Sequence, residues 1–410
     1  MFFYDILIHI TRLALEVFGL FNPKLKKGIE GRKQTFGILK KNILKHDKTL
    51  WFHCASLGEF EQGLPVFKEL RKIYPSHKFI LSFFSPSGYE IRKNTSAADV
   101  VVYLPWDTKT NAKRFMDYVH PELIVFVKYE VWPNILLEAK NRNIKAILIS
   151  ALFRKDQIYF KFYGGLMKRA LLSFDHIFTQ NKPSEELLHS LGYQKTTISG
   201  DTRFDRVYSQ LEQDNNLDFV SVFKQNKLCV VAGSTWSEDE AYFVNYVNSK
   251  NPENTKFIIA PHNINKGAIE KLKNSFNEKV ALYSERNSVD LTQMKILIID
   301  TIGLLTKIYS YANIGYVGGA AGNTGLHNTL EPAIFGVPII IGNNYQKFPE
   351  AKDMIAEKGM LTVKNQSEFD EILSYLVNHP TEIEKIGSRN FDYIEKNRGA
   401  VIQITTFLRK

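Results

Sequence analysis

The chain has 410 residues, of which 44% are hydrophobic and 23% are charged. These proportions exclude disordered and collagen-like chains, and the length predicts two domains of roughly 200 residues each. The two cysteines, Cys54 and Cys229, lie in separate apolar runs and form no Cys-x-x-Cys pair. We therefore expect two reduced core thiols rather than a disulfide or a metal site.

The net charge of +10 is concentrated at the N-terminus. Residues 1–50 contain ten Lys and Arg but four Asp and Glu, so this segment supplies +6 and the remaining 360 residues supply +4. A basic arm on a nearly neutral body indicates an anionic surface such as a membrane. It argues against a nucleic-acid partner, because base-stacking aromatic residues do not accompany basic residues across the body.

Residues 1–21 predict a helix with one polar stripe. Its ionisable residues are Asp5, His9, Arg12 and Glu16, which at helical spacing fall within roughly 60° of one another. Four polar groups argue against a lipid-spanning helix. A signal peptide fits the pattern less well than an interfacial helix does, because no basic start or small-residue cleavage site is present. We expect an amphipathic helix in the membrane interface, with the stripe facing lipid headgroups and the basic cluster 24–27 following it. The residues expected in the acyl boundary are Phe2, Ile6, Leu13, Val17 and Leu20. The alternative is a helix whose apolar side packs on its own domain.

After residue 50, short apolar runs alternate with helix-length amphipathic stretches. Continuous runs of this kind predict strands buried on both faces of parallel sheets, joined by right-handed crossovers. The runs are 50–55, 79–84, 100–104, 123–127, 146–149 and 176–179, then, after a polar stretch at 210–216, 228–232, 257–260, 280–283, 296–299, 314–317, 337–341 and 360–363. The sequence therefore predicts an α/β protein of two Rossmann-like domains facing across a cleft, with ligands at the carboxyl ends of the strands.

Two acidic residues follow predicted strands. Glu59 comes after the run 50–55, in the first turn of a helical stretch. A carboxylate at this place can act as a general base on an acceptor hydroxyl, although acids also favour first helical turns for structural reasons. Glu130 follows the run 123–127 and precedes Trp132-Pro133. On spacing alone it lines a sugar site or caps the helix that the proline starts.

Two further segments predict contacts to a phosphorylated ligand. The glycine-rich segment 317–332 leads into a helix that begins at about residues 329–331, because Pro332 is tolerated only in a first turn. Free amides at this helix start would bind an anion and Glu331 would accept from ribose hydroxyls, unless the loop is purely structural. It is not a Walker loop, because Gly-Lys-Ser/Thr is absent. Arg203, near the domain junction, faces a phosphate or forms a surface ion pair.

No spacing typical of metal ligands is present, such as Asp-x-Asp, His-x-x-x-His or Cys-x-x-Cys. We therefore expect no metal and no cofactor. In a metal-free mechanism, arginine and lysine side chains and backbone amides would neutralise a leaving phosphate.

Taken together, these segments resemble those of the Kdo transferases, inverting glycosyltransferases of GT-B architecture that transfer the acidic sugar Kdo (3-deoxy-D-manno-octulosonic acid). The resemblance runs over nearly the whole chain. The family's His-x-x-Ser-x-Gly-Glu resembles residues 53–59, its Glu-Thr-Glu-Leu-Trp-Pro-Asn resembles 128–134, and its Gly-Asn-Leu-Lys-Phe-Asp resembles 200–205. Its Asp-Thr-x-Gly-Glu-Leu resembles 300–305, and its Gly-Gly-His-Asn-Pro-Leu-Glu-Pro resembles 325–332.

The resemblance implies a membrane-interface segment (1–30), an acceptor-binding domain (31–207) and a CMP-Kdo-binding domain (208–410). It implies transfer of Kdo from CMP-Kdo to a lipid A precursor, lipid IVA, in lipopolysaccharide core biosynthesis at the cytoplasmic face of the inner membrane. The implied catalytic residues are Glu59 as base, Glu130 as second acid and Arg203 as stabilising cation. The implied donor-binding residues are Pro261, His262, Gly303, Leu304, Leu305, Asn328, Thr329, Leu330 and Glu331.

The sequence departs from the family pattern at five places. These are Lys128, His262, Leu304, Leu326 and Thr329, where the family has Glu, Arg, Glu, Gly and Pro. Histidine in place of arginine weakens a phosphate contact or changes its pH dependence.

Two other classes of function stay open. One is another GT-B enzyme, such as a UDP-sugar 2-epimerase or a UDP-sugar transferase, which would not need a lipid-facing helix. The other is a non-enzymatic peripheral membrane or nucleic-acid-binding protein that acts through its basic charge.

Overall fold

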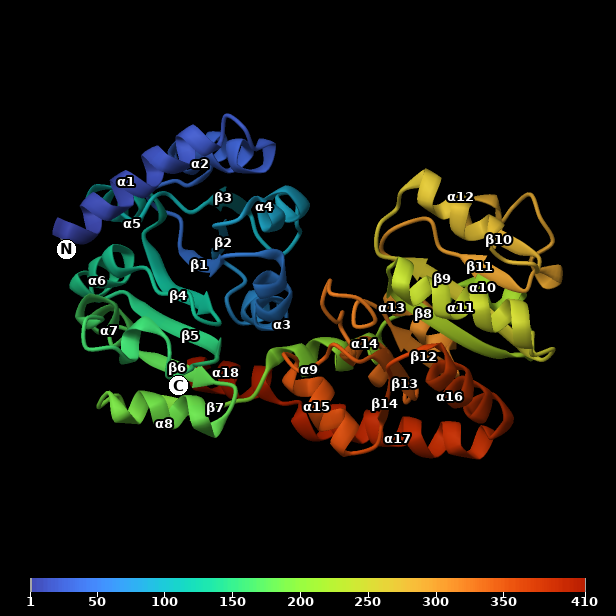
Figure 1. Cartoon of the computed structure of the whole chain (residues 1–410). Coiled ribbons are helices and arrows are strands. Elements are labelled where there is room, and N and C mark those ends of the chain that lie inside the picture. The colour runs from blue at the N-terminus through green and yellow to red at the C-terminus, as the bar shows by residue number, and fades with distance from the viewer. Residues whose placement is uncertain (1, 410) are drawn as a thin grey trace. The chain divides into compact units, whose positions relative to one another are not determined.

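The computed structural model describes residues 2–409, which divide into two compact units (Figure 1). Unit 1 contains the residues up to Arg206 together with those from Arg398 onward, and unit 2 is Val207–Asn397. Each unit is built on a seven-stranded sheet in which the paired strands are parallel. The expected α/β architecture of two Rossmann-like domains is confirmed.

The sheet of unit 1 has the strand order β3-β2-β1-β4-β5-β6-β7. The order reverses between β1 and β4, and open α/β sheets bind ligands at the carboxyl ends of strands beside such a reversal. The strands are β1 (Thr49–Cys54), β2 (Lys78–Phe83), β3 (Val100–Tyr103), β4 (Pro121–Val127), β5 (Lys145–Ala151), β6 (His176–Thr179) and β7 (Thr196–Ile198). The helices are α1 (Phe2–Phe18), α2 (Pro23–Asn42), α3 (Leu57–Ile73), α4 (Pro86–Arg92), α5 (Lys109–Val119), α6 (Pro133–Asn141), α7 (Gly165–Leu171), α8 (Lys182–Ser190), α9 (Thr202–Tyr208) and α18 (Ala400–Arg409).

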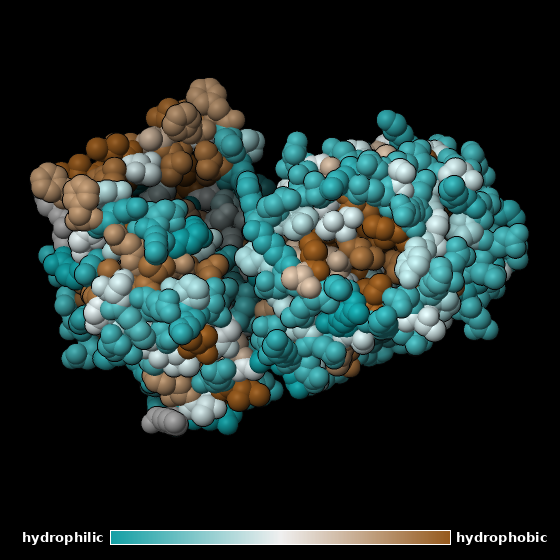
Figure 2. All heavy atoms as spheres, turned by 60° about the horizontal axis from the view of Figure 1, so that its bottom comes forward, coloured by the Kyte–Doolittle hydropathy of each residue, from teal (hydrophilic) through white to brown (hydrophobic). Residues whose placement is uncertain are grey.

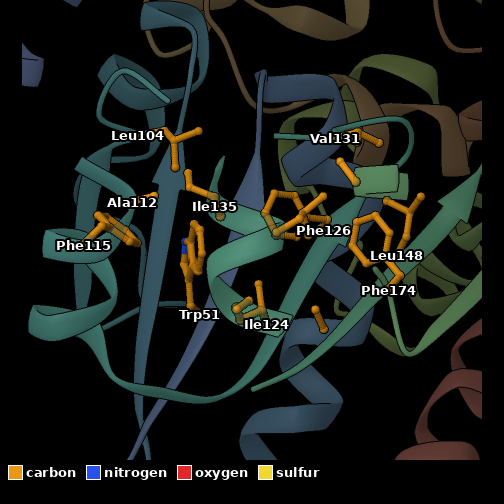
Figure 3. Close-up of a cluster of buried hydrophobic side chains, with 14 of the residues drawn as sticks. Trp51, Leu104, Ala112, Phe115, Ile124, Phe126, Val131, Ile135, Leu148 and Phe174 are labelled. Atoms are coloured by element: carbon orange, nitrogen blue, oxygen red, sulfur yellow. The ribbon is translucent and has the colours of Figure 1, made fainter. Parts of the chain in front are cut away.

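Hydrophobic side chains fill both faces of this sheet, because successive strand residues point to opposite sides. Trp51 of β1 points to the face that α2, α5, α6 and α7 cover, and Phe52 points to the face that α3 and α18 cover. Figure 3 shows Trp51 close to Phe115 and Phe126, with ring centroids 4.7 and 5.4 Å away. The two central strands are therefore packed from both sides, which fixes the position of the loops that follow them.

The sheet of unit 2 has the order β10-β11-β9-β8-β12-β13-β14, with its reversal between β8 and β12. The strands are β8 (Leu228–Thr235), β9 (Thr255–Pro261), β10 (Val280–Leu282), β11 (Ile296–Ile298), β12 (Ile314–Val317), β13 (Ile339–Gly342) and β14 (Met360–Val363). The helices are α10 (Asp218–Lys224), α11 (Ser237–Lys250), α12 (Lys266–Asn274), α13 (Leu305–Ile308), α14 (Leu330–Ala333), α15 (Pro349–Ala356), α16 (Gln366–Asn378) and α17 (Pro380–Asn397).

Every apolar run that the sequence predicts as a strand forms one. β7 was not predicted, because Thr196–Ile198 is partly exposed and contains no run of apolar residues. Cys54 and Cys229 are buried and unpaired, as expected.

The last helix lies in unit 1, whereas the sequence assigned all of residues 208–410 to the second domain. The carboxylate of Asp205 accepts hydrogen bonds from the amides of Gly399 and Ala400 at 3.0 and 3.1 Å, and so caps the start of α18. The ring of Phe407 packs 4.2 Å from that of His176 in β6. An amphipathic helix can cover either sheet, and these long-range contacts decide which one it covers.

The polar stripe of α1 contacts unit 1 through Asp5, whereas His9 and Arg12 of the same stripe are exposed. Oδ1 of Asp5 accepts a hydrogen bond from Nδ2 of Asn134 at 2.8 Å. His9 and Arg12 line a pocket of about 330 Å³ with Trp106 of the loop after β3. Helical spacing shows that a stripe exists, but the partner of the stripe is set by tertiary contacts.

The opposite side of α1 is apolar and exposed, so it does not pack on its own domain. Leu13 is 62% exposed, and Leu20, which follows the helix, is 76% exposed. Figure 2 shows hydrophobic surface at the upper left, where α1 lies in Figure 1. The exposed side chains are Phe3, Ile6, Leu7, Ile10, Leu13, Val17, Phe18, Leu20 and Phe21; the side chain of Phe2 lies outside the described part. Among residues 2–409, no helix is both long and apolar enough to span a bilayer.

Candidate active site

Glu59 lies at the carboxyl end of β1, beside the reversal of strand order. It is the third residue of α3 and forms a capping box with Ser56. Its Oε2 accepts hydrogen bonds from the amide of Ser56 at 3.1 Å and from the amide of Ala55. The residue is only 6% exposed. The carboxylate is thus fixed in direction and held out of bulk water.

Burial raises the pKa of Glu59 to about 7, and the negative charge of Glu130 acts in the same direction. The two backbone hydrogen bonds and the charge of Lys128 lower it and oppose these effects. A carboxyl group with a pKa near neutrality is suited to accept a proton from a hydroxyl group, which is the task of a general base.

Glu130 follows β4, the neighbour of β1, in the loop before α6. Its Oε2 lies 2.9 Å from Nε1 of Trp132 and 3.3 Å from Nε2 of His53. His53 is fully buried in β1, and its Nδ1 lies 2.8 Å from Oγ of Ser82 in β2. Side chains from three adjacent strands and their loops therefore hold Glu130 near Glu59.

Glu130 does not cap α6, the alternative that its spacing left open. The amides of Asn134 and Ile135 donate instead to the carboxylate of Asp107, each at 3.0 Å. Asp107 and His53 were not predicted as site residues, and no spacing in the sequence links either to Glu130.

Arg203 is the second residue of α9, and its side chain is 35% exposed. Its Nε donates to Oδ2 of Asp201 at 2.8 Å, and Nε2 of Gln62 in α3 donates to Oδ1 of Asp201 at 2.8 Å. The ion pair that the sequence left open as an alternative is thus present. Asp201 also fixes the guanidinium in direction and links it to the helix that carries Glu59.

In unit 2, three aromatic rings stack at the ends of neighbouring strands. The ring of His262, which follows β9, lies 4.8 Å from Trp236, which follows β8, and 4.4 Å from His327. Nε1 of Trp236 donates to Nε2 of His327 at 3.2 Å. Burial, followed by the charge of His262, lowers the pKa of His327 to about 4, so at neutral pH this ring is uncharged and accepts the bond. His262 is exposed and follows Pro261 directly.

The other predicted donor-binding residues gather around Glu331. Its Oε1 accepts from Nδ2 of Asn328 and its Oε2 from Oγ1 of Thr306, each at 3.0 Å. Thr306 lies in α13, directly after Leu304 and Leu305 and near Gly303, whose φ of +96° favours glycine. The structure therefore brings 303–306 and 328–331 together, although they are far apart in the sequence.

Three details differ from the sequence prediction for this segment. Leu330 is fully buried and Thr329 is 2% exposed, so neither residue presents appreciable surface to a ligand. α14 starts where expected but has only four residues, too few for a substantial helix dipole. The amide of Leu330 is also taken by Oδ1 of Asn328 at 3.2 Å. An anion site at this helix start is therefore not supported.

Asp239 anchors the glycine-rich loop and was not predicted. It is fully buried in α11 and accepts from the amides of Trp236 and Gly319, each at 2.9 Å, and from the hydroxyl of Tyr316 at 2.7 Å. A side chain at Gly318 would meet the carbonyl oxygen of Ser234 at 2.4 Å. The glycines therefore allow the loops after β12 and β8 to approach each other. Within residues 2–409, no three His, Cys, Asp or Glu side chains group as metal ligands do.

Residues 30–206, most of unit 1, match the family model described as 3-deoxy-D-manno-octulosonic-acid transferase (Kdo transferase). A 3-deoxy-D-manno-octulosonic acid transferase of Haemophilus influenzae is 26% identical over 424 residues, which cover 100% of this chain and 98% of that protein. A bifunctional glycosyltransferase/methyltransferase of Fusobacterium nucleatum is 28% identical over 411 residues; the match covers 96% of this chain, which spans 62% of that protein's length.

Unit 1 therefore carries a Kdo transferase domain, and the similarity to proteins named as Kdo transferases extends over most of the chain. The chain is a glycosyltransferase related to these enzymes. Among solved structures, the UDP-GlcNAc 2-epimerase from Neisseria meningitidis is similar, with a TM-score of 0.64 and 17% identity over 88% of this chain and 100% of that one. At such low identity this similarity supports the GT-B fold and carries no statement about the reaction.

The raised pKa of Glu59 predicts how the stability of this enzyme depends on pH. Folding takes up a proton between pH 4.5 and about 7, so the free energy of unfolding falls as the pH rises through this range. Glu59→Gln removes that penalty. We expect the variant to gain roughly 1–3 kcal/mol relative to wild type between pH 5 and pH 8, measured by denaturant unfolding. If the free energies of unfolding of Glu59→Gln and wild type differed by the same amount at pH 5 as at pH 8, Glu59 would have an ordinary pKa.

Proposed function

We propose that this Kdo transferase moves Kdo from CMP-Kdo onto a lipid A precursor, lipid IVA, with inversion at the anomeric carbon. The observation that carries the proposal is the buried carboxylate of Glu59, with a pKa of about 7, in the unit that matches the Kdo transferase model. The family relationship supports a Kdo donor and a lipid acceptor. The expected place of the reaction is the cytoplasmic face of the inner membrane, in lipopolysaccharide core biosynthesis.

In the proposed reaction, Glu59 removes the proton from a glucosamine hydroxyl of the acceptor. The hydroxyl oxygen forms a bond to the anomeric carbon of Kdo, while the bond from that carbon to the phosphate oxygen breaks. CMP leaves with the electron pair of that bond, and the proton stays on Glu59 until water takes it. Burial, and after it the charge of Glu130, keeps the pKa of Glu59 near neutral, so that the base is strong enough to accept the proton.

Unit 2 would hold the donor. Glu331 and Asn328 offer acceptor and donor atoms to ribose hydroxyls, and the loop at Gly303 approaches the nucleotide through its backbone. The exposed ring of His262, stacked on Trp236, would contact the phosphate in place of the arginine that the family pattern has. Arg203, held by Asp201, would neutralise the charge that develops on the leaving phosphate.

The direct test is to incubate the enzyme with CMP-Kdo and lipid IVA and to weigh the lipid products by mass spectrometry. The wild-type enzyme should add Kdo, also in excess EDTA, and Glu59→Gln should lose about 10²–10⁴-fold in rate because the general base is missing. Glu61→Gln, on the same helix, is the control and should keep its activity. A Glu59→Gln enzyme that retains more than about a tenth of the wild-type rate would exclude the general-base role.

A UDP-sugar enzyme is the remaining alternative, because the fold is shared with a UDP-GlcNAc 2-epimerase. Calorimetric titration separates the two. We expect CMP to bind and UDP to bind at least tenfold more weakly. Glu331→Ala should weaken CMP binding by about 1–3 kcal/mol, as expected for a lost charged hydrogen-bond acceptor. Tighter binding of UDP than of CMP would favour the alternative.

We also propose that the exposed apolar side of α1 enters the membrane interface and that the exposed Lys24, Lys26 and Lys27 add attraction to anionic lipids. Replacing Ile6 and Leu13 by Asp should release the enzyme from anionic vesicles, because the buried apolar area is lost. Transfer to vesicle-embedded acceptor should then fall more than transfer to a detergent-dispersed acceptor. Replacement of the three lysines by glutamine should weaken binding by roughly 1 kcal/mol per residue at low salt. Unchanged sedimentation of the Ile6/Leu13 variant with vesicles would refute this role of α1.

A further inference from the structure

Two polar residues of α1 reach the first turn of α6. The hydroxyl of Tyr4 donates to Oδ2 of Asp107 at 2.9 Å, and Oδ1 of Asp5 accepts from Nδ2 of Asn134 at 2.8 Å. Residues 2–18 lie outside the segment that matches the family model, which begins at residue 30. The contacts are therefore made by a helix that precedes the matched domain.

Asp107 is the residue through which Tyr4 acts on α6. It is 1% exposed, and its two oxygens accept from the amides of Asn134 and Ile135 as well as from Tyr4. The residue before α6, Trp132, provides no side-chain cap for the helix. The start of α6 thus depends on a carboxylate from the loop after β3, and a hydroxyl from α1 holds that carboxylate in place.

The start of α6 in turn fixes Trp132, because Pro133 joins the two and restricts the backbone at the junction. The indole Nε1 of Trp132 lies 2.9 Å from Oε2 of Glu130, and its ring packs 4.9 Å from that of Phe84. A short series of hydrogen bonds and covalent bonds therefore connects the α1 contacts to Glu130.

We propose that Tyr4 and Asp5 are positioning residues for transfer: when α1 is docked on α6, it holds Trp132 and Glu130 in place beside the catalytic carboxylate of Glu59. The helix then serves the reaction with its polar side and the membrane with its apolar side. This inference rests on the proposed function, because it assigns Glu130 a part in Kdo transfer.

The test uses variants of the full-length enzyme with a detergent-dispersed acceptor, so that membrane binding does not limit the rate. Tyr4→Phe and Asp5→Ala should lower kcat roughly tenfold, since small displacements of catalytic groups have effects of this size or larger. The KM for CMP-Kdo should stay within about twofold, because the donor-binding residues lie in unit 2. Asp5→Asn should restore kcat, as an amide oxygen also accepts the bond from Asn134.

Leu7→Asn is the matched control on the exposed side of the same helix. It should weaken vesicle binding and leave kcat with dispersed acceptor unchanged, whereas Asp5→Ala should do the reverse. If Tyr4→Phe does not fold, the Asp5→Ala and Asp5→Asn pair decides the question, since Asp5 is only partly buried. Wild-type kcat in Asp5→Ala would overturn the proposal.

A second measurement does not depend on the reaction. Hydrogen–deuterium exchange of the amides of Asn134 and Ile135 should be faster in Tyr4→Phe and Asp5→Ala than in wild type and in Leu7→Asn, because both amides donate to Asp107. If the wild-type enzyme transfers no Kdo but exchange responds as stated, the proposed function fails and the contact between α1 and α6 stands. Unchanged exchange in both variants would overturn the positioning role.

Discussion

Two carboxylates, the buried Glu59 and the partly buried Glu130, lie within each other's electrostatic field, and the rest of the site is arranged around them. Burial, and after it the like charge of Glu130, resists the ionisation of Glu59, so Glu59 keeps its proton to higher pH than an exposed glutamate would. The strand order imposes this arrangement, because one acid follows β1 and the other follows the adjacent β4. Backbone amides fix Glu59, and His53 and Trp132 fix Glu130. The raised pKa of Glu59 lowers the stability of the protein at neutral pH, and the same shift suits the general-base role that we propose for this residue.

Unit 2 also has an acidic residue in the first turn of the helix that follows its first strand, but this residue has a different role. Asp239 is the third residue of the helix after β8, as Glu59 is of the helix after β1. Its carboxylate is fully buried and accepts three hydrogen bonds, which tie the glycine-rich loop after β12 to the end of β8. Asp239 therefore orders a loop, whereas Glu59 is the residue that we propose accepts a proton.

Much of this could be predicted from the sequence, because buried parallel strands are continuous apolar runs and the acids follow them at once. The features that the sequence did not predict correctly depend on contacts between residues far apart in the chain. The spacing in α1 shows two unlike sides but not which side meets the domain, and α18 fits either sheet by pattern. Pro332 predicts where α14 starts but not that it ends after four residues. Asp107 and Trp236 belong to no periodic pattern, and only their partners, distant in the sequence, reveal their roles.

The central claim is that a buried Glu59, coupled to Glu130, is the base of the transfer reaction. The most direct measurement is the pH dependence of kcat/KM for wild type and for Glu130→Gln, from pH 4 to pH 9. In wild type we expect an acidic limb with an apparent pKa near 7. In the slower Glu130→Gln enzyme the limb should move to lower pH, because the negative charge of Glu130 no longer raises the pKa of Glu59. A wild-type limb near 4.5, or a limb that Glu130→Gln leaves in place, would contradict the account.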